Sequence, residues 1–248
     1  MLIVGDSIAE YMGRTLETFC PGSQVYNVGK SGSTAEDWAK MSSDVVKDCK
    51  DTDWDEVYIS IGGNDILDSG CSITANELYK TLDDAVTNIA TKIAPGASTY
   101  LVPGYCIASG PASGGCATPD NMAAFSEVFE MMQKDGLSVE DQGINVVVTN
   151  SISECGGSES SFSDTKYFVD PIHMNDKGYC NVLTQTEVQD ALSCGKTSFD
   201  CEKFELDLYG MGDKDCPITG LGDDNGANGN VLSTLLSITS FVFFYLIQ

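Results

Sequence analysis

Apolar and polar positions along residues 1–192 follow two repeats, one typical of strands and one typical of helices. Short apolar runs with strand propensity occur at residues 2–4, 23–27, 56–61, 98–103 and 144–149. Stretches in which apolar residues recur every three or four positions follow them, at residues 9–19, 34–46, 74–93, 118–132 and 175–192. This alternation predicts an α/β fold with a doubly wound, mostly parallel five-stranded sheet, in a flavodoxin-like three-layer α/β/α arrangement.

Polar residues mark where three of these helices begin. Thr34 with Asp37, and Thr74 with Glu77, have the spacing of a capping box, in which each side chain satisfies a backbone N–H group. Asp6 directly precedes the first helical stretch, and we expect its side chain to cap that helix.

Residues suited to chemistry follow the first three strands. Ser7 ends a Gly-Asp-Ser turn after the first strand, a glycine-containing turn occupies residues 29–34, and Asn64 follows the third strand. In open α/β sheets, the carboxyl ends of the strands meet at one rim, where the active sites lie. Ser7 would also begin a helix, whose backbone N–H groups favour developing negative charge.

His173 is the only histidine of the chain, and it comes three residues after Asp170. A carboxylate at this spacing can fix the orientation of the imidazole, which leaves the opposite ring nitrogen to take a proton from Ser7. Serine is a weak nucleophile at neutral pH without such a base. Taken singly, Ser7 and Asn64 are ordinary turn residues and His173 is an ordinary helix-entry residue; together they predict a serine–histidine site.

These residues resemble four blocks of the SGNH hydrolase superfamily, the GDSL-type esterases and lipases. The blocks occur in the family's order over residues 1–192, at residues 5–7, 27–34, 62–65 and 170–173. Ile8 replaces the leucine of the GDSL name, which is a conservative change.

The resemblance implies a carboxylic ester hydrolase with the catalytic triad Ser7, His173 and Asp170. Ser7 would attack the ester carbonyl, His173 would act as general base and then as acid, and Asp170 would orient His173. The backbone N–H groups of Ser7 and Gly32 and the side-chain amide of Asn64 would hold the oxyanion. This chemistry needs no metal and no organic cofactor.

The segments at residues 104–120 and 151–166 are rich in small and polar residues and contain no extended apolar lid. They favour an open cleft for a small-molecule or carbohydrate ester with a small acyl group, such as a sugar acetate. A lysophospholipid or a thioester remains open as substrate. Two alternative functions also remain: acyl transfer to an alcohol by the same triad, and a non-catalytic cell-surface binding module.

The chain is strongly acidic, with 37 acidic against 13 basic residues and a formal net charge of −24. No cluster of lysine and arginine interrupts this charge. The balance excludes nucleic acid as a partner and disfavours polyanionic substrates, because both are repelled by an acidic surface.

The cysteines number ten, and none forms a Cys-x-x-Cys motif. With a single histidine, they indicate disulfides in an oxidising compartment rather than a metal site. Cys106 and Cys116 flank a loop that they are placed to staple, while the other pairings stay open. We therefore expect a secreted or cell-surface protein.

Composition divides the chain into a hydrolase domain (1–193), a cysteine-containing extension (194–224) and a polar spacer with an apolar tail (225–248). The tail is typical of a GPI-attachment signal, which would attach the protein to a membrane; a spanning helix or a segment packed on the core are the alternatives. Met1 runs directly into the first strand without a signal peptide. Because secretion needs one, we expect a trimmed chain or a misassigned start.

Overall fold

The structure, a computed structural model, describes residues 1–49, 52–104, 119–149, 167–169, 173–194 and 198–204. In this part of the chain, five strands form one all-parallel sheet in the order β2-β1-β3-β4-β5. The strands are β1 (Leu2–Gly5), β2 (Tyr26–Asn27), β3 (Glu56–Ser60), β4 (Thr99–Pro103) and β5 (Val146–Thr149). The predicted doubly wound, five-stranded α/β fold is confirmed.

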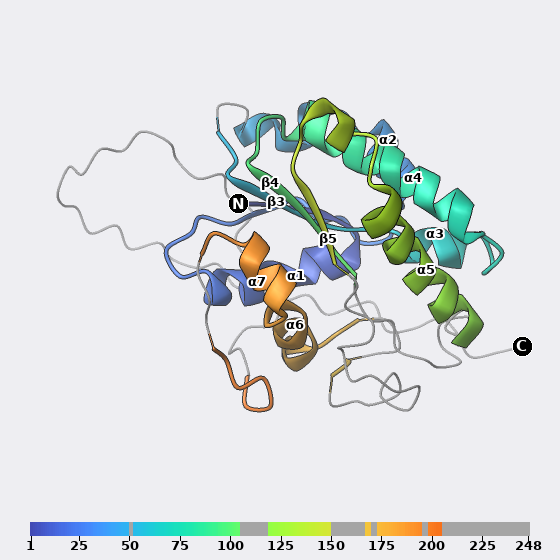
Figure 1. Cartoon of the computed structure of the whole chain (residues 1–248). Coiled ribbons are helices and arrows are strands. Elements are labelled where there is room, and N and C mark those ends of the chain that lie inside the picture. The colour runs from blue at the N-terminus through green and yellow to red at the C-terminus, as the bar shows by residue number, and fades with distance from the viewer. Residues whose placement is uncertain (50–51, 105–118, 150–166, 170–172, 195–197, 205–248) are drawn as a thin grey trace, which may run out of the picture. The chain divides into compact units, whose positions relative to one another are not determined.

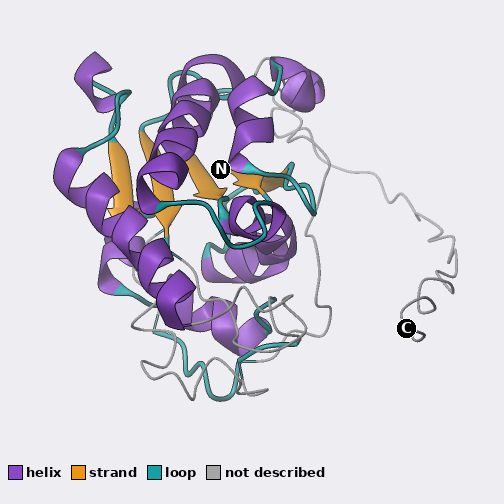
Figure 2. Cartoon of the chain, turned by 90° about the vertical axis from the view of Figure 1, so that its right-hand side faces the viewer, coloured by secondary structure: helices purple, strands orange, loops and turns teal. Residues whose placement is uncertain are grey.

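Helices cover both faces of this sheet (Figure 1). One face carries α1 (Ser7–Phe19), α6 (Asp176–Leu183) and α7 (Thr186–Ala191). The other face carries α2 (Ala35–Lys40), α4 (Ala75–Asn88) and α5 (Pro119–Asp135). Figure 2, turned by 90°, shows the strands between these two helical layers. Helices on both faces explain why β1 and β3 are buried along their whole length, as parallel strands must be.

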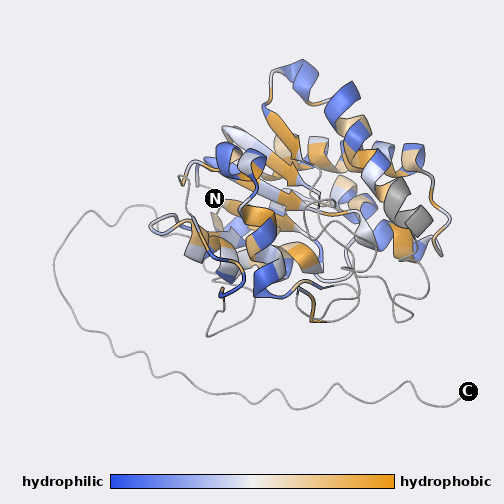
Figure 3. Cartoon of the chain, turned by 60° about the horizontal axis from the view of Figure 1, so that its bottom comes forward, coloured by the Kyte–Doolittle hydropathy of each residue, from blue (hydrophilic) through white to orange (hydrophobic). Residues whose placement is uncertain are grey.

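The core fills the space between the sheet and the helices. Figure 3 shows mainly apolar strands and helices that have one polar side, the arrangement that amphipathic helices on a sheet produce. The largest fully enclosed side chains include Phe19, Trp38, Tyr58, Tyr100, Phe125, Phe129 and Tyr179.

Local hydrogen bonds fix the helix starts as predicted. The Asp6 side chain accepts the Ile8 N–H at 2.9 Å, which caps α1. Reciprocal capping boxes begin α2 and α4. These starts depend only on residues within one turn of the helix, so the sequence pattern identifies them directly.

The predicted helix over residues 34–46 is shorter in the structure. Helix α2 ends at Lys40, and a 3₁₀ helix over Ser43–Cys49 follows. The side-chain amide of Asn88, on α4, donates a hydrogen bond to the Trp38 carbonyl oxygen at 2.8 Å. A neighbouring helix therefore satisfies a carbonyl at the end of α2, and α2 can stop there.

Two further elements also differ from the prediction. The helical stretch over residues 175–192 is divided into α6 and α7, because Gln185 has an extended backbone with ψ 140°. A short helix, α3 (Gly63–Asp68), begins soon after β3, and the apolar pattern predicts no helix there. Gly62 permits this sharp start because its φ of +112° is one that glycine adopts readily.

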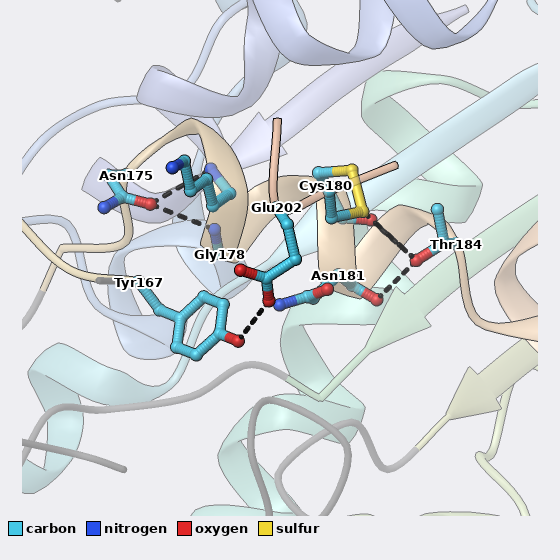
Figure 4. The surroundings of a disulfide bond; sticks show 9 residues. Tyr167, Asn175, Gly178, Cys180, Asn181, Thr184 and Glu202 are labelled. Carbon is cyan, nitrogen blue, oxygen red and sulfur yellow. Dashed lines mark hydrogen bonds between the residues drawn. A yellow bond between two sulfur atoms is a disulfide. The ribbon is translucent and has the colours of Figure 1, made fainter. Parts of the chain in front are cut away.

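Disulfides fasten the C-terminal part of the described chain to the sheet domain. Cys20, at the end of α1, is bonded to Cys194, and Cys180, on α6, is bonded to Cys201 (Figure 4). Such bonds form in oxidising compartments, which indicates that the protein folds outside the reducing cytoplasm. Cys49 and Cys71 are disulfide-bonded as well.

The beginning of the cysteine-containing extension also packs on the domain through aromatic rings. The Phe19 ring centroid lies 4.1 Å from that of Phe199 and 5.6 Å from that of Phe204. These rings therefore place Phe199 and Phe204 against the end of α1.

Several predictions concern residues outside the described part of the chain. They are the Cys106–Cys116 pair, the loop at residues 151–166, the rest of the extension to residue 224, and the tail at residues 225–248. Among the helices that the structure describes, none combines the length and the apolar character needed to cross a membrane.

Candidate active site

Ser7 is the first residue of α1, and the single residue Asp6 separates it from the end of β1. Gly5 ends the strand with a φ of +138°, and a Cβ atom there would lie 1.9 Å from the Ser60 carbonyl oxygen. The Asp6 N–H donates to this same carbonyl oxygen at 2.9 Å. Strand β3 therefore fixes the turn before Ser7, and only glycine fits at its start.

His173 directly precedes Met174, which forms a short antiparallel bridge, and Asn175, which caps helix α6. Phe168 pairs with Met174 in that bridge, and the Val169 N–H donates to the His173 carbonyl oxygen at 2.9 Å. Met174 is fully buried, and the side chain of Asn175 accepts two backbone N–H groups at the start of α6. We call residues 167–169 and 173–175 the histidine turn; its contacts fix the backbone from His173 to Asn175.

The structure brings the predicted nucleophile and base together. The His173 Nε2 atom lies 2.8 Å from the Ser7 Oγ atom, although 166 residues separate them in the chain. The Tyr11 ring packs edge-on against the imidazole, with centroids 5.5 Å apart and planes at 83°. Sequence reasoning missed Tyr11, which its position four residues after Ser7 on the same helix could have indicated. Asp170, the predicted third member of the triad, lies outside the described residues.

The turn that follows β2 packs tightly on α1. The buried Asn27 amide donates to the carbonyl oxygens of Ala9 and Glu10 at 3.1 and 3.0 Å, and its Oδ1 accepts the Gly29 N–H at 2.8 Å. A Cβ atom on Gly29 would lie 2.5 Å from the Glu10 nitrogen, so the approach requires glycine. Gly32 follows in this turn with a φ of +77°.

Asn64 and its neighbour Asp65 lie in the first turn of α3 and both reach the segment after Gly32. The Asn64 amide donates to the Ser33 carbonyl oxygen at 2.9 Å, which uses one of its two N–H groups. The Asp65 carboxylate accepts the Ala35 N–H at 2.8 Å. Burial raises the pKa of the Asp65 carboxyl, and the backbone hydrogen bonds that it accepts oppose this rise.

The order of the strands explains why these segments meet. Strand β1 lies between β2 and β3, so the turn that carries Gly32 and the helix start that carries Asn64 follow the two strands beside the one that leads to Ser7. This is the point where the strand order reverses, and ligands of doubly wound sheets bind there.

Gly178 on α6 also supports the site. The sequence did not indicate this role, because Gly178 lies inside a helix rather than in a turn that a glycine would mark. Its ideal Cβ atom would lie 2.5 Å from the Tyr167 carbonyl oxygen and 2.8 Å from the Met174 Cβ. Both contacts are in the histidine turn. Figure 4 shows Gly178 beside Asn175, and Tyr167 donating a hydrogen bond of 3.0 Å to Glu202, next to the Cys180–Cys201 disulfide.

Replacing Gly178 by alanine is therefore expected to push the histidine turn away from Ser7. A displacement on the order of 1 Å can cost roughly 100-fold in rate. We expect a loss of this order in kcat, measured by steady-state ester hydrolysis, with folding checked by circular dichroism. Glu187→Ala, an exposed change on α7, is the control. A Gly178→Ala enzyme with the parent kcat would contradict this role.

A known protein family matches the part of the chain that contains Ser7 and His173. A family model described as "GDSL-like Lipase/Acylhydrolase family" matches residues 3–179, which include Ser7 and His173. A search of curated protein sequences finds no match.

Solved structures share the fold. A GDSL-like lipase from Bacteroides thetaiotaomicron aligns with a TM-score of 0.53 and 14% identity, over 77% of this chain and 88% of its own. An acetylxylan esterase from Geobacillus stearothermophilus aligns with a TM-score of 0.51 and 15% identity, over 79% and 96%. A carbohydrate esterase family 3 protein from Talaromyces cellulolyticus aligns with a TM-score of 0.51 and 16% identity, over 73% and 91%.

The family match covers most of the chain, and it spans the serine that follows β1 and the histidine that contacts it. The chain therefore belongs to the GDSL-like lipase/acylhydrolase family, the SGNH hydrolases, and is an esterase that acts on ester bonds.

Proposed function

We propose that Ser7 is the nucleophile of this esterase and His173 its general base. The observation that carries the proposal is the 2.8 Å separation between the Ser7 Oγ and His173 Nε2 atoms. The Ser7 oxygen attacks the ester carbonyl carbon while its proton passes to Nε2. The tetrahedral intermediate then expels the alcohol, which takes this proton, and Ser7 is left acylated. Water, deprotonated by His173, releases the acid and restores the enzyme.

The same proposal assigns the other site residues. The backbone N–H groups of Ser7 and Gly32 and the second N–H of the Asn64 amide hold the oxyanion, and Asp170 orients His173. The order of β2, β1 and β3 supports this assignment, because the segments with Gly32 and Asn64 follow the two strands that flank the one leading to Ser7. The N-terminus of α1 adds a favourable field for the negative charge.

Replacing Asn64 by alanine is expected to lower kcat by about 10²–10³-fold, the cost of losing one oxyanion donor. KM should change little, because the charge that this amide stabilises develops only in the transition state. Steady-state kinetics on p-nitrophenyl acetate measure both constants. Asn145→Ala is the matched control, because that amide also donates to a backbone carbonyl oxygen, of Ser98, but at the start of β5. An unchanged kcat in Asn64→Ala would exclude the oxyanion role.

We propose that the substrate is a neutral, polar ester with a small acyl group, such as an acetylated carbohydrate. The formal charge of −24 disfavours polyanionic esters. The likeness to an acetylxylan esterase and to a carbohydrate esterase supports the proposal, as does the small and polar composition of residues 104–120 and 151–166.

A substrate panel tests this specificity. Acetylated xylo-oligosaccharides, p-nitrophenyl acetate, p-nitrophenyl octanoate and lysophosphatidylcholine are compared by kcat/KM, with Ser7→Ala as the blank. We expect the acetyl esters to be preferred. Preference for the octanoyl ester or the lysolipid would overturn the substrate class but not the assignment of Ser7. Adding excess alcohol would separate hydrolysis from acyl transfer, because a transferase forms the new ester at the expense of acetate.

The disulfides support a place of action outside the reducing cytoplasm. Attachment to a membrane through residues 225–248 stays a prediction, since that segment lies outside the described residues.

A further inference from the structure

Ser33 makes contact with every segment to which we have assigned an oxyanion donor. Ser33 directly follows Gly32, and only 3% of its surface is exposed. Its carbonyl oxygen accepts the Asn64 amide at 2.9 Å. Its hydroxyl lies 3.1 Å from the Gly5 carbonyl oxygen, two residues before Ser7, and 2.8 Å from the Lys30 carbonyl oxygen. A hydroxyl has one hydrogen, so these two carbonyl groups share it.

The Ser33 hydroxyl is in turn fixed from the core. It accepts the indole N–H of Trp38 at 2.9 Å, and Trp38 is fully buried. Asn88 on α4 holds the Trp38 backbone through the carbonyl bond already described. A continuous set of hydrogen bonds thus runs from α4 through Trp38 and Ser33 to the turn before Ser7.

We propose that Ser33 is a positioning residue that fixes the relative places of the three oxyanion donors. This inference rests on the proposed function, since it concerns the same donors. Ser33 acts through Gly5, Gly32 and Asn64 rather than on the substrate. Oxyanion donors must lie 2.7–3.1 Å from the developing charge, so about one ångström of freedom between them weakens the stabilisation.

Two substitutions break this set of bonds at different points. Ser33→Ala removes the hydroxyl and leaves the indole N–H of Trp38 buried without its acceptor. Trp38→Phe removes the donor from the core but keeps an aromatic ring, and the Ser33 hydroxyl can still bond the Gly5 or Lys30 carbonyl oxygen. Only Trp38→Phe interrupts the link without creating an unsatisfied polar group near the turn.

We expect Ser33→Ala to lower kcat by about tenfold or more with KM within about twofold, because the donors act mainly in the transition state. Trp38→Phe should also lower kcat. The kcat of the double variant should be no lower than that of Ser33→Ala alone, because both changes remove the same hydrogen bond between Trp38 and Ser33. Ser33→Thr keeps a hydroxyl and should recover part of the rate.

The measurement must separate positioning from folding. Rates are divided by the concentration of active sites, titrated by the burst of p-nitrophenol, and the inhibition constant of methylboronic acid is determined for each variant. This acid forms a tetrahedral adduct on serine, so its inhibition constant should rise by the same factor as kcat/KM falls. Tyr100→Phe is the control: it removes another buried hydroxyl, bonded to the Ala94 carbonyl oxygen, and should lower Tm without changing kcat per site.

The outcomes decide between the two proposals. If Ser33→Ala does not fold, Trp38→Phe decides by the same measurements. A parent kcat per site and a parent boronic acid constant in the folded variants would overturn the role of Ser33. They would leave the proposed function intact as long as Ser7→Ala is inactive. An active Ser7→Ala enzyme would instead overturn the proposed function itself.

Discussion

Replacement of Ser7 by alanine is expected to lower kcat for ester hydrolysis by about 10⁴–10⁶-fold, the loss seen when a serine hydrolase loses its nucleophile. The methyl group cannot form the acyl intermediate, and His173 keeps no hydroxyl to deprotonate. Release of p-nitrophenol from the acetate ester gives the rate, and the mass of the intact protein shows whether an acetyl group becomes attached.

His173→Ala should cause a comparable loss, and the double variant should be no slower than either single variant, because the two side chains act as one unit. Ser23→Ala, an exposed serine after α1, is the matched control and should keep the parent rate. Activity above roughly one per cent of the parent in Ser7→Ala would mean that another group performs the attack.

Of the proposed substitutions, removal of the Cys20–Cys194 disulfide is expected to lower the free energy of unfolding most. The bond spans 174 residues, and the entropy that this cross-link removes from the unfolded chain corresponds to about 5 kcal/mol. The Cys20→Ser, Cys194→Ser double variant should lose free energy of unfolding of that order. Urea denaturation followed by circular dichroism provides the value.

The Cys180–Cys201 bond provides an internal comparison, because it spans only 21 residues. The same argument gives about 3 kcal/mol for its removal by the paired serine changes. A greater loss for the shorter bond would show that native contacts near Cys201, rather than the entropy of the unfolded chain, determine the contribution of these cross-links.

The parts of the fold that the sequence predicts depend on local patterns. Apolar runs indicated all five strands, and the capping boxes at Thr34 and Thr74 indicated where α2 and α4 begin. The end of α2 could not be predicted, because it depends on the Asn88 amide, which lies 50 residues away from Trp38 in the chain. The disulfide pairings depend on the fold in the same way.

In the candidate site, too, the residues that the sequence predicts are those in local motifs. Ser7, Gly32, Asn64 and His173 occur in short motifs at strand or helix ends, and topology predicts that such ends meet. The supporting residues carry no such signal. Ser33 looks like a turn residue in the sequence, and the role of Gly178 arises only where α6 touches the histidine turn.

The bond between Cys20 and Cys194 has a consequence for a cleaved chain. Ser7 precedes the first of these cysteines, and His173 precedes the second, so a single backbone cut between residues 20 and 173 puts the two side chains on different fragments. The cross-link keeps those fragments in one molecule. A nicked protein should therefore migrate as one band without reductant and as two bands with it, and the hydroxyl and the imidazole can stay paired after proteolysis.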